Sequence, residues 1–217
     1  MPTKRQVLGD FYHREAKKRG FRSRSALKLL ELARRYRIFN KGDCVVDLGA
    51  APGGWLQVAR DFVGSKGKVI GVDLSEIEPL PFENVHLIKG DIFDPSIIKQ
   101  IIELVGGPVD VVLSDLAPKF SGIHDLDHAR QIELARSALT ISKTIIRQGG
   151  KMVIKLIMGS EFDQFLKDVR QMFQSVSLYK PKASRERSSE IYLICKGWKG
   201  SFGKDLETFQ NNRNISN

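Results

Sequence analysis

Four aspartates occur at or near the ends of apolar, strand-like runs, and their positions indicate a binding site. They are Asp47, Asp73, Asp91 and Asp115. In an open α/β sheet the carboxyl ends of the parallel strands meet at one edge, and ligands bind there. We therefore predict a site at that edge in which several carboxylates face one ligand.

The segment from Gly49 to Gly54 lies between a β-branched run at 45–48 and a helical pattern at 55–60. A strand, a glycine-rich turn and a helix in this order place backbone N–H groups at a helix N-terminus, where a ligand can approach closely. The spacing Gly49-x-Ala51-x-x-Gly54 narrowly misses the dinucleotide-binding fingerprint, and no Gly-Lys-Ser/Thr follows as in a phosphate loop. We interpret the turn as a cofactor cradle, although a tight turn without a ligand has a similar composition.

Asp73 ends the second strand-like run, where a carboxylate can accept hydrogen bonds from a ribose diol. That position alone also fits a nicotinamide-dependent dehydrogenase. The further acids at the same edge favour a cationic cofactor that carries adenosine over one that carries a pyrophosphate. S-adenosylmethionine, with a sulfonium and an ammonium group, is such a cofactor, and Asp91 would then lie at its adenine edge.

Lys155 interrupts the apolar run from Met152 to Ile157, so we expect its side chain to be at least partly buried. A lysine can accept a proton only when its pKa has fallen through burial or a neighbouring cation. The alternative is a strand lysine whose amine reaches solvent. Lys28 lies inside a basic helical stretch, and its sequence context alone predicts a solvent-exposed residue.

Positive charge is concentrated at the start of the chain. Residues 1–41 contain 13 Lys/Arg and 3 Asp/Glu, whereas the remainder contains 22 of each. Such a segment is typical of a protein that binds a polyanion, although it can also be a solubilising surface. We expect this segment and the basic stretch 180–187 to contact RNA phosphates. The side chains concerned include Arg22, Arg24, Arg34, Arg35, Lys180, Lys182, Arg185 and Arg187.

The composition is that of one soluble domain. The chain has 217 residues, of which 41% are hydrophobic and 28% charged, and this length is sufficient for a buried core. No apolar run approaches the roughly 20 residues that span a bilayer, and the N-terminus lacks the apolar part of a signal peptide. Cys44 and Cys195 lack CxxC spacing and indicate buried thiols in a reducing compartment, so the expected location is the cytoplasm.

Apolar runs alternate with helical patterns along the chain, which predicts an α/β fold with a mostly parallel sheet and helices on both faces. We expect a single domain over 1–200 with a basic helical segment at 1–41, and a flexible tail at 201–217. The expected strands are 45–48, 67–73, 85–91, 109–115, 151–157, 175–179 and 191–195.

Helix boundaries are also predicted from local sequence. Ser23 or Ser25 is expected to cap the helix that follows, and the glycine pair at 149–150 is expected to close a helix over 126–147. Residues 1–20 should form a helix or an arm that packs only in part.

Several motifs together resemble the FtsJ-like ribose 2′-O-methyltransferases. They are Asp47-Leu48-Gly49-Ala50-Ala51-Pro52-Gly53-Gly54-Trp55, Gly90-Asp91, Ser114-Asp115-Leu116-Ala117-Pro118, Lys155 and Arg187-Ser188-Ser189-Glu190. The resemblance covers about residues 8–198 and is specific in its combination of motifs. It implies the Rossmann-like fold of S-adenosylmethionine-dependent methyltransferases, with seven strands, and an archaeal source.

The resemblance also implies roles for individual residues. In that family a Lys-Asp-Lys-Glu tetrad surrounds the reacting hydroxyl, and the matching positions are Lys28, Asp115, Lys155 and Glu190. Contacts to S-adenosylmethionine fall on Gly53, Trp55, Asp73, Asp91 and Asp115, with Asp47 and Gly49 in the same turn. Lys155 would accept the hydroxyl proton while Asp115 orients it. Lys28 would supply a neighbouring positive charge, positioned by Glu190.

The expected reaction is therefore methylation of the 2′-hydroxyl of a uridine in large-subunit ribosomal RNA, by a monomer without a metal ion. Transfer RNA and an mRNA cap are alternative substrates, but a cap enzyme needs an aromatic slot for methylguanine, and the sequence shows no obvious one. A nicotinamide dehydrogenase and a non-catalytic RNA-binding protein are more distant alternatives. Retention of the whole tetrad argues against the second of these.

Overall fold

The computed structural model describes residues 4–184 and 188–202, with side chains described from residue 11 onward. The helices are α1 (Lys4–Lys18), α2 (Ser25–Tyr36), α3 (Gly54–Val63), α4 (Ser96–Val105), α5 (His124–Ile145) and α6 (Phe162–Met172). The strands are β1 (Cys44–Leu48), β2 (Lys68–Asp73), β3 (Val85–Lys89), β4 (Val109–Ser114), β5 (Ile146–Ile157), β6 (Phe173–Tyr179) and β7 (Glu190–Trp198). Most of the predicted tail, together with Arg185 and Arg187, lies outside the described residues.

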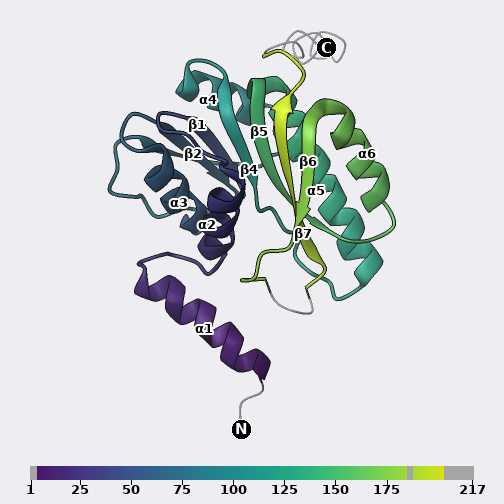
Figure 1. Cartoon of the computed structure of the whole chain (residues 1–217). Coiled ribbons are helices and arrows are strands. Elements are labelled where there is room, and N and C mark those ends of the chain that lie inside the picture. The colour runs from purple at the N-terminus through teal and green to yellow at the C-terminus, as the bar shows by residue number, and fades with distance from the viewer. Residues whose placement is uncertain (1–3, 185–187, 203–217) are drawn as a thin grey trace.

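The strands form one seven-stranded sheet in the order β3-β2-β1-β4-β5-β7-β6 (Figure 1). Neighbouring strands from β3 to β5 are parallel, and β7 runs antiparallel to both β5 and β6. The predicted mostly parallel α/β sheet is confirmed. The strand order reverses between β1 and β4, and ligands in such sheets bind beside the carboxyl ends at that reversal.

Helices cover both faces of the sheet because successive strand side chains point to opposite sides. In β1, Val45 packs into the core shared with α2 and α3, whereas Val46 packs into the core shared with α4, α5 and α6. Leu29 and Leu32 of α2 are fully buried in the first of these cores. Burial of each such side chain contributes about 1.5–3 kcal/mol, which holds the basic helix α2 against the sheet.

Helix α1 contacts the rest of the protein mainly near its C-terminal end. Ala16 is buried against Leu27 of α2 and Ala183, whereas Phe11 is 53% exposed. Figure 1 shows the helix extending away from the sheet beyond α2. The predicted helix or arm with partial packing is therefore present as a helix. Within the described chain, no helix has both the length and the apolarity to cross a membrane.

The predicted serine cap of α2 is wrong. Arg24, which precedes the helix, already has helical backbone angles, and no side chain caps it. The chain enters through a tight turn in which the N–H of Ala26 donates to the carbonyl of Ser23 at 3.3 Å. The hydroxyls of Ser23 and Ser25 hydrogen bond to each other at 2.8 Å instead of to the helix N-terminus.

The predicted end of the long helix is also wrong, because the glycine pair at 149–150 lies inside β5. Helix α5 ends at Ile145, and β5 begins pairing with β4 at the next residue. Val109 of β4 pairs with Ile146, but Val111 pairs with Lys151, so the register shifts and β5 has more residues than β4 over this stretch. Gly149 lies in the shifted part and has a φ of +75°. Strands β6 and β7 are longer than predicted, and β3 stops at Lys89.

Candidate active site

The carboxyl ends of the central strands bring the predicted site residues to one face of the sheet. Side chains alternate along a strand, so Asp47 shares a face with Val45, and Lys155 shares a face with Val153. Both valines belong to the core beneath α2 and α3. The acids of this edge and Lys155 therefore converge on the side of the sheet that α2 covers.

Lys155 and Asp115 form an ion pair at this edge. Lys155 Nζ lies 3.1 Å from Asp115 Oδ1 and also donates to the Asp115 backbone carbonyl at 2.6 Å. Lys155 is only 8% exposed, which confirms its predicted burial and excludes the alternative of an amine in open solvent. Two contacts to one neighbour fix the position of the amine.

Tyr192 lies directly opposite Lys155 in the antiparallel pairing of β5 with β7. Its hydroxyl donates to Asp115 Oδ1 at 2.7 Å. Burial first, and then the charges of Asp115 and Glu190, raise the pKa of the Tyr192 phenol well above its ordinary value. The phenol therefore stays protonated and keeps donating, so Asp115 is held by two donors.

Lys28 of α2 and Glu190, the first residue of β7, form a second ion pair. Lys28 Nζ lies 2.5 Å from Glu190 Oε1, and Lys28 is buried, which contradicts the exposure predicted from its basic context. Burial acts to raise the pKa of Glu190, but the charge and hydrogen bond of Lys28 outweigh it, and the pKa is lowered. Lys28 Nζ also lies 5.8 Å from the centre of the Tyr192 ring, so both ion pairs adjoin one tyrosine.

The turn after β1 requires glycine at two points. Gly49 has a φ of +82°, and a Cβ there would lie 2.8 Å from Leu116 Cδ2. Gly53 has a φ of +105°, and a Cβ there would lie 3.0 Å from a guanidinium nitrogen of Arg22. A residue with a side chain would be strained at either position. The turn is thus packed between the loop after β4 and the N-terminal segment.

The Trp55 ring is part of the protein core. It is almost fully buried, its centroid lies 5.9 Å from that of Tyr192, and its indole N–H donates to the Ser25 carbonyl at 2.9 Å. The ring is therefore committed to protein contacts. Any contact of Trp55 with a cofactor is restricted to its backbone N–H in the first turn of α3, where such groups lack helical partners.

Asp73 and Asp91 follow the paired strands β2 and β3. The two oxygens of Asp73 accept hydrogen bonds from the backbone N–H groups of Ala51 at 3.0 Å and Ser75 at 2.8 Å. Asp91 Oδ1 accepts from the N–H of Phe93 at 3.0 Å. A cavity of about 310 Å³, lined by residues 75–77 and 87–89, lies at this end of the two strands.

Asp47 is fully buried, and neither of its carboxyl oxygens has a hydrogen-bond partner among the described residues. Burial first, and then the charges of Asp115 and Asp73, raise the pKa of the Asp47 carboxyl well above its ordinary value. Buried polar atoms in native proteins are nearly always paired. An unpaired acid beside a glycine turn indicates a place for a ligand that donates hydrogen bonds or carries positive charge.

The family model of the FtsJ-like methyltransferases matches residues 21–198 of the chain. The chain belongs to this family. Ribosomal RNA large subunit methyltransferase E from Methanothrix thermoacetophila is 50% identical over 187 residues, which cover 86% of this chain and 72% of that protein. The protein of the same name from Methanothermobacter thermautotrophicus is 45% identical over 191 residues, which cover 88% and 90%.

A solved structure is also similar to this FtsJ-like chain. It is a Plasmodium falciparum protein assigned as a ribosomal RNA methyltransferase, with a TM-score of 0.74 and 32% sequence identity. The match covers 83% of this chain and 100% of that one. The resemblance stated from sequence and the methyltransferase fold are thus confirmed, and the archaeal relatives are consistent with the predicted source. The protein is a methyltransferase, and its family implies a methyl donor.

The structure brings all four residues of the predicted tetrad together in this methyltransferase, but it adds two residues that the sequence analysis missed. Tyr192 lies two positions after Glu190, on the same face of β7, and that spacing is a signal that could have identified it. Gln131 of α5 donates to the carbonyls of Leu116 at 3.2 Å and Lys155 at 3.0 Å. No local pattern indicates that contact, because it joins three separate elements.

Arg22, which is predicted to contact RNA phosphates, also has partners within the protein. Its guanidinium donates to the carbonyls of Glu78, Pro79 at 2.8 Å and Pro52 at 3.4 Å. It therefore bridges the glycine turn and the segment after β2.

Within the described residues, no group of three or more His, Cys, Asp or Glu side chains is arranged to hold a metal ion.

Proposed function

We propose that this protein is an S-adenosylmethionine-dependent RNA 2′-O-methyltransferase whose target is a uridine in large-subunit ribosomal RNA. One observation carries the proposal: the Lys155–Asp115 and Lys28–Glu190 pairs converge on Tyr192 beside a glycine turn. A proton acceptor and a fixed cation around one reaction centre are what activation of a ribose hydroxyl requires.

Features of the turn support S-adenosylmethionine as the methyl donor. Asp47 is a buried acid without a hydrogen-bond partner among the described residues, and it can accept a hydrogen bond from the ammonium group of this cofactor. Each oxygen of Asp73 accepts one backbone hydrogen bond and retains capacity for a ribose hydroxyl. Gly49, Gly53 and the backbone of Trp55 complete the cradle. When bound, S-adenosylmethionine supplies a methyl group activated by a positively charged sulfur.

The adenosine part of the cofactor has a matching cavity. The space of about 310 Å³ between residues 75–77 and 87–89 adjoins Asp73 at the end of β2. Asp91, two residues beyond β3, leaves one carboxyl oxygen for the adenine edge, because only Oδ1 accepts a hydrogen bond from Phe93. These residues bind and orient the cofactor in the proposal.

The tetrad residues act on the ribose hydroxyl. Lys155 would accept the proton of the ribose hydroxyl. Asp115 keeps the Lys155 amine in position through the 3.1 Å contact, and Tyr192 holds Asp115. The Lys28 ammonium, fixed by Glu190, places a positive charge where negative charge develops on the oxygen.

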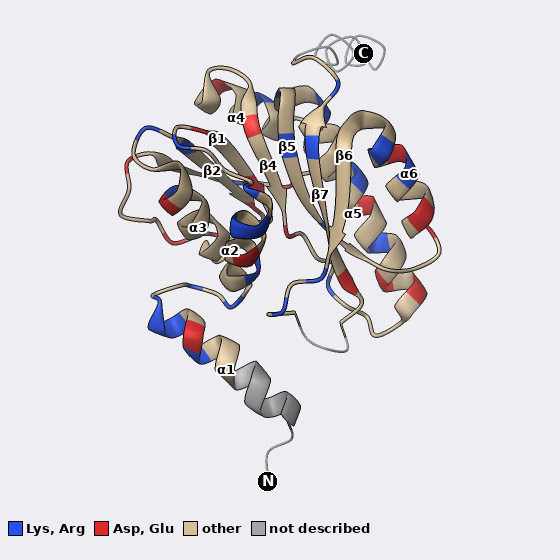
Figure 2. Ribbon diagram, in the orientation of Figure 1, with Lys and Arg blue, Asp and Glu red and all other residues tan. Residues whose placement is uncertain are grey.

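The substrate assignment is supported by the relatives and by charge. The two archaeal relatives are named as ribosomal RNA large subunit methyltransferases. Figure 2 shows Lys and Arg along α1, α2 and the segment between them. Transfer RNA and an mRNA cap fit the same chemistry without this support. A ribosomal substrate is consistent with the cytoplasmic location expected from the sequence.

The proposal is tested by methyl transfer from labelled S-adenosylmethionine to large-subunit RNA. RNA from a strain that lacks the gene should accept label, and RNA from the parent strain should accept almost none, because its site is already methylated. Calorimetry should detect binding of S-adenosylmethionine but not of NAD. Equal labelling of the two RNAs, or binding of NAD alone, would contradict the proposal.

A further inference from the structure

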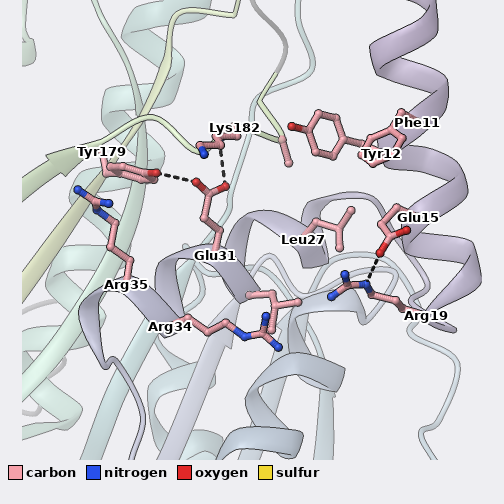
Figure 3. A pocket seen from close by; sticks show the side chains of 12 residues that line it. Phe11, Tyr12, Glu15, Arg19, Leu27, Glu31, Arg34, Arg35, Tyr179 and Lys182 are labelled. Carbon is pink, nitrogen blue, oxygen red and sulfur yellow. Dashed lines mark hydrogen bonds and ion pairs between the residues drawn. The ribbon is translucent and has the colours of Figure 1, made fainter.

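A second cavity lies outside the tetrad, between the N-terminal helices and the end of β6. Its volume is about 690 Å³, within the range of small-molecule sites. Figure 3 shows Phe11 and Tyr12 of α1 on one side, Tyr179 on the other, and Glu31 of α2 between them. Neither the tetrad nor the cofactor turn contributes to its lining.

The acids of this cavity are already paired within the protein. Glu15 Oε1 accepts from Arg19 Nε at 2.6 Å. Glu31 accepts from the Tyr179 hydroxyl at 2.6 Å and from the backbone N–H of Lys182 at 3.0 Å. The charge of Glu15 is thus compensated by Arg19, and both oxygens of Glu31 are occupied by neutral donors. The lining as a whole carries four cationic side chains, Arg19, Arg34, Arg35 and Lys182, against these two acids, so the cavity favours an anion over a further cation.

Two cations of the cavity, Arg34 and Arg35, form fewer polar contacts within the protein than its acids do. Arg34 and Arg35 are exposed on α2. The Arg35 guanidinium lies 4.9 Å from the centre of the Tyr179 ring, a contact that leaves its charge available. The Arg34 guanidinium forms no hydrogen bond or ion pair with any other side chain in the described part of the protein. With the acids paired, these groups favour an anionic ligand.

The aromatic residues add a stacking surface. Phe11 is 53% exposed and meets Tyr12 edge-on, with 5.4 Å between ring centroids. An exposed aromatic ring beside arginine guanidinium groups is the usual means by which proteins hold an unstacked base and its phosphate. The combination fits a nucleotide better than it fits an acidic peptide, which has no flat ring to stack.

The cavity also shares its wall with the reaction centre. Leu27, which lines it, is the residue before Lys28, and it packs against Ala183, another lining residue. The cavity therefore lies next to the tetrad, separated from Lys28 by one position of α2.

We propose that the cavity binds an unstacked nucleotide of the substrate RNA that flanks the methylated one, with Phe11 stacking on the base and Arg34 contacting a phosphate. This inference rests on the proposed function and extends it to a subsite for RNA outside the catalytic tetrad. Residues 11–35, of which only α2 covers the sheet, then select single-stranded RNA.

The test is steady-state methyl transfer to large-subunit RNA from a strain that lacks the gene. Phe11→Ala should raise KM for RNA about 10-fold with little change in kcat, because one stacking partner is lost. Phe11→Trp should restore KM, since it retains a stacking ring. Arg34→Ala should raise KM and lower the slope of log K against log salt by about 1. Phe202→Ala and Arg170→Ala, at exposed sites outside the cavity, should behave as wild type.

Two kinetic outcomes would overturn the subsite. One is a Phe11→Ala variant with the KM of Phe202→Ala, and the other is an Arg34→Ala variant with an unchanged salt slope. A p-benzoylphenylalanine at position 11 should also crosslink to RNA next to the methylated nucleotide, and a crosslink elsewhere would contradict the assignment. In each case wild-type activity on the same RNA shows that the proposed function stands, whereas an inactive wild-type protein would remove the function itself.

Discussion

Lys155 is the residue on which the proposed chemistry depends. Replacement by Ala removes the proton acceptor but leaves the glycine turn and Asp73 unchanged, so cofactor binding should persist. The single-turnover rate should fall by roughly 10²–10⁴, the usual contribution of a positioned base. Lys155→Arg should fail too, because guanidinium stays protonated. An arginine variant with a near wild-type rate would show that only positive charge is needed at this position.

Asp47 makes stability depend on pH in the direction opposite to that of most acids. Its pKa is raised in the folded protein, so the folded state retains a proton that the unfolded state loses above about pH 4. Stability should therefore fall as pH rises from there, by up to about 1.4 kcal/mol per pH unit until the folded-state pKa is reached. Asp47→Asn should remove this slope. Urea unfolding of both proteins between pH 4.5 and 6.5 measures it, and parallel profiles would refute the prediction.

Replacement of Arg22 should weaken cofactor binding more than it weakens RNA binding. Its guanidinium joins Pro52 to residues 78–79, so Arg22→Ala frees the glycine turn. We expect S-adenosylmethionine binding to weaken by about 1–2 kcal/mol, since these bonds are partly exposed. Arg24→Ala is the control, with the same loss of charge on the adjoining segment. If calorimetry shows equal cofactor affinity for the two variants, Arg22 does not support the cofactor site, and its predicted role in RNA binding is preferred.

The strand β7 shows how much of the site the sequence could predict. Its apolar run and Glu190 can be recognised in the sequence, but its length and register cannot, because they depend on pairing with β5 and β6 on its two sides. That register places Tyr192 opposite Lys155. A tyrosine in a strand usually fills a core, so its residue type alone did not reveal its contact with Asp115. The strands β1, β2 and β4 were easier, since buried parallel strands are continuous runs of Val and Ile.

The N-terminus of α3 packs closely against the segment before α2. A Cβ at Gly54 would lie 2.1 Å from Ser23 Oγ and 3.3 Å from the Ser23 backbone nitrogen. Gly54→Ala should therefore destabilise the protein by about 1–3 kcal/mol, as overpacking does. Ser23→Ala in the same chain should recover part of that loss by removing the oxygen. Chemical denaturation of the two single variants and the double variant gives the coupling, and additive effects would show that the contact is relieved elsewhere.

The molecule carries its excess charge on one side of the reaction centre. The balance of basic and acidic residues after position 41 could be read from the sequence, and so could the basic segment before it. The cavity of Figure 3 could not, because it forms only when residues 11–35 meet residues 179–183. Tertiary contacts likewise decide whether a cation on this surface has partners. Arg22 has them, whereas Arg34 has no hydrogen bond or ion pair with another side chain among the described residues.

The identity of the methylated nucleoside tests the central claim most directly. Large-subunit RNA from a strain that lacks the gene is methylated with labelled S-adenosylmethionine, digested to nucleosides and separated by liquid chromatography with mass detection. The account predicts label in 2′-O-methyluridine, transferred roughly 10²–10⁴ times more slowly by Lys155→Ala under the same conditions. Label in a base-methylated nucleoside would contradict the account, because the Lys155–Asp115 and Lys28–Glu190 pairs would then not act on a ribose hydroxyl.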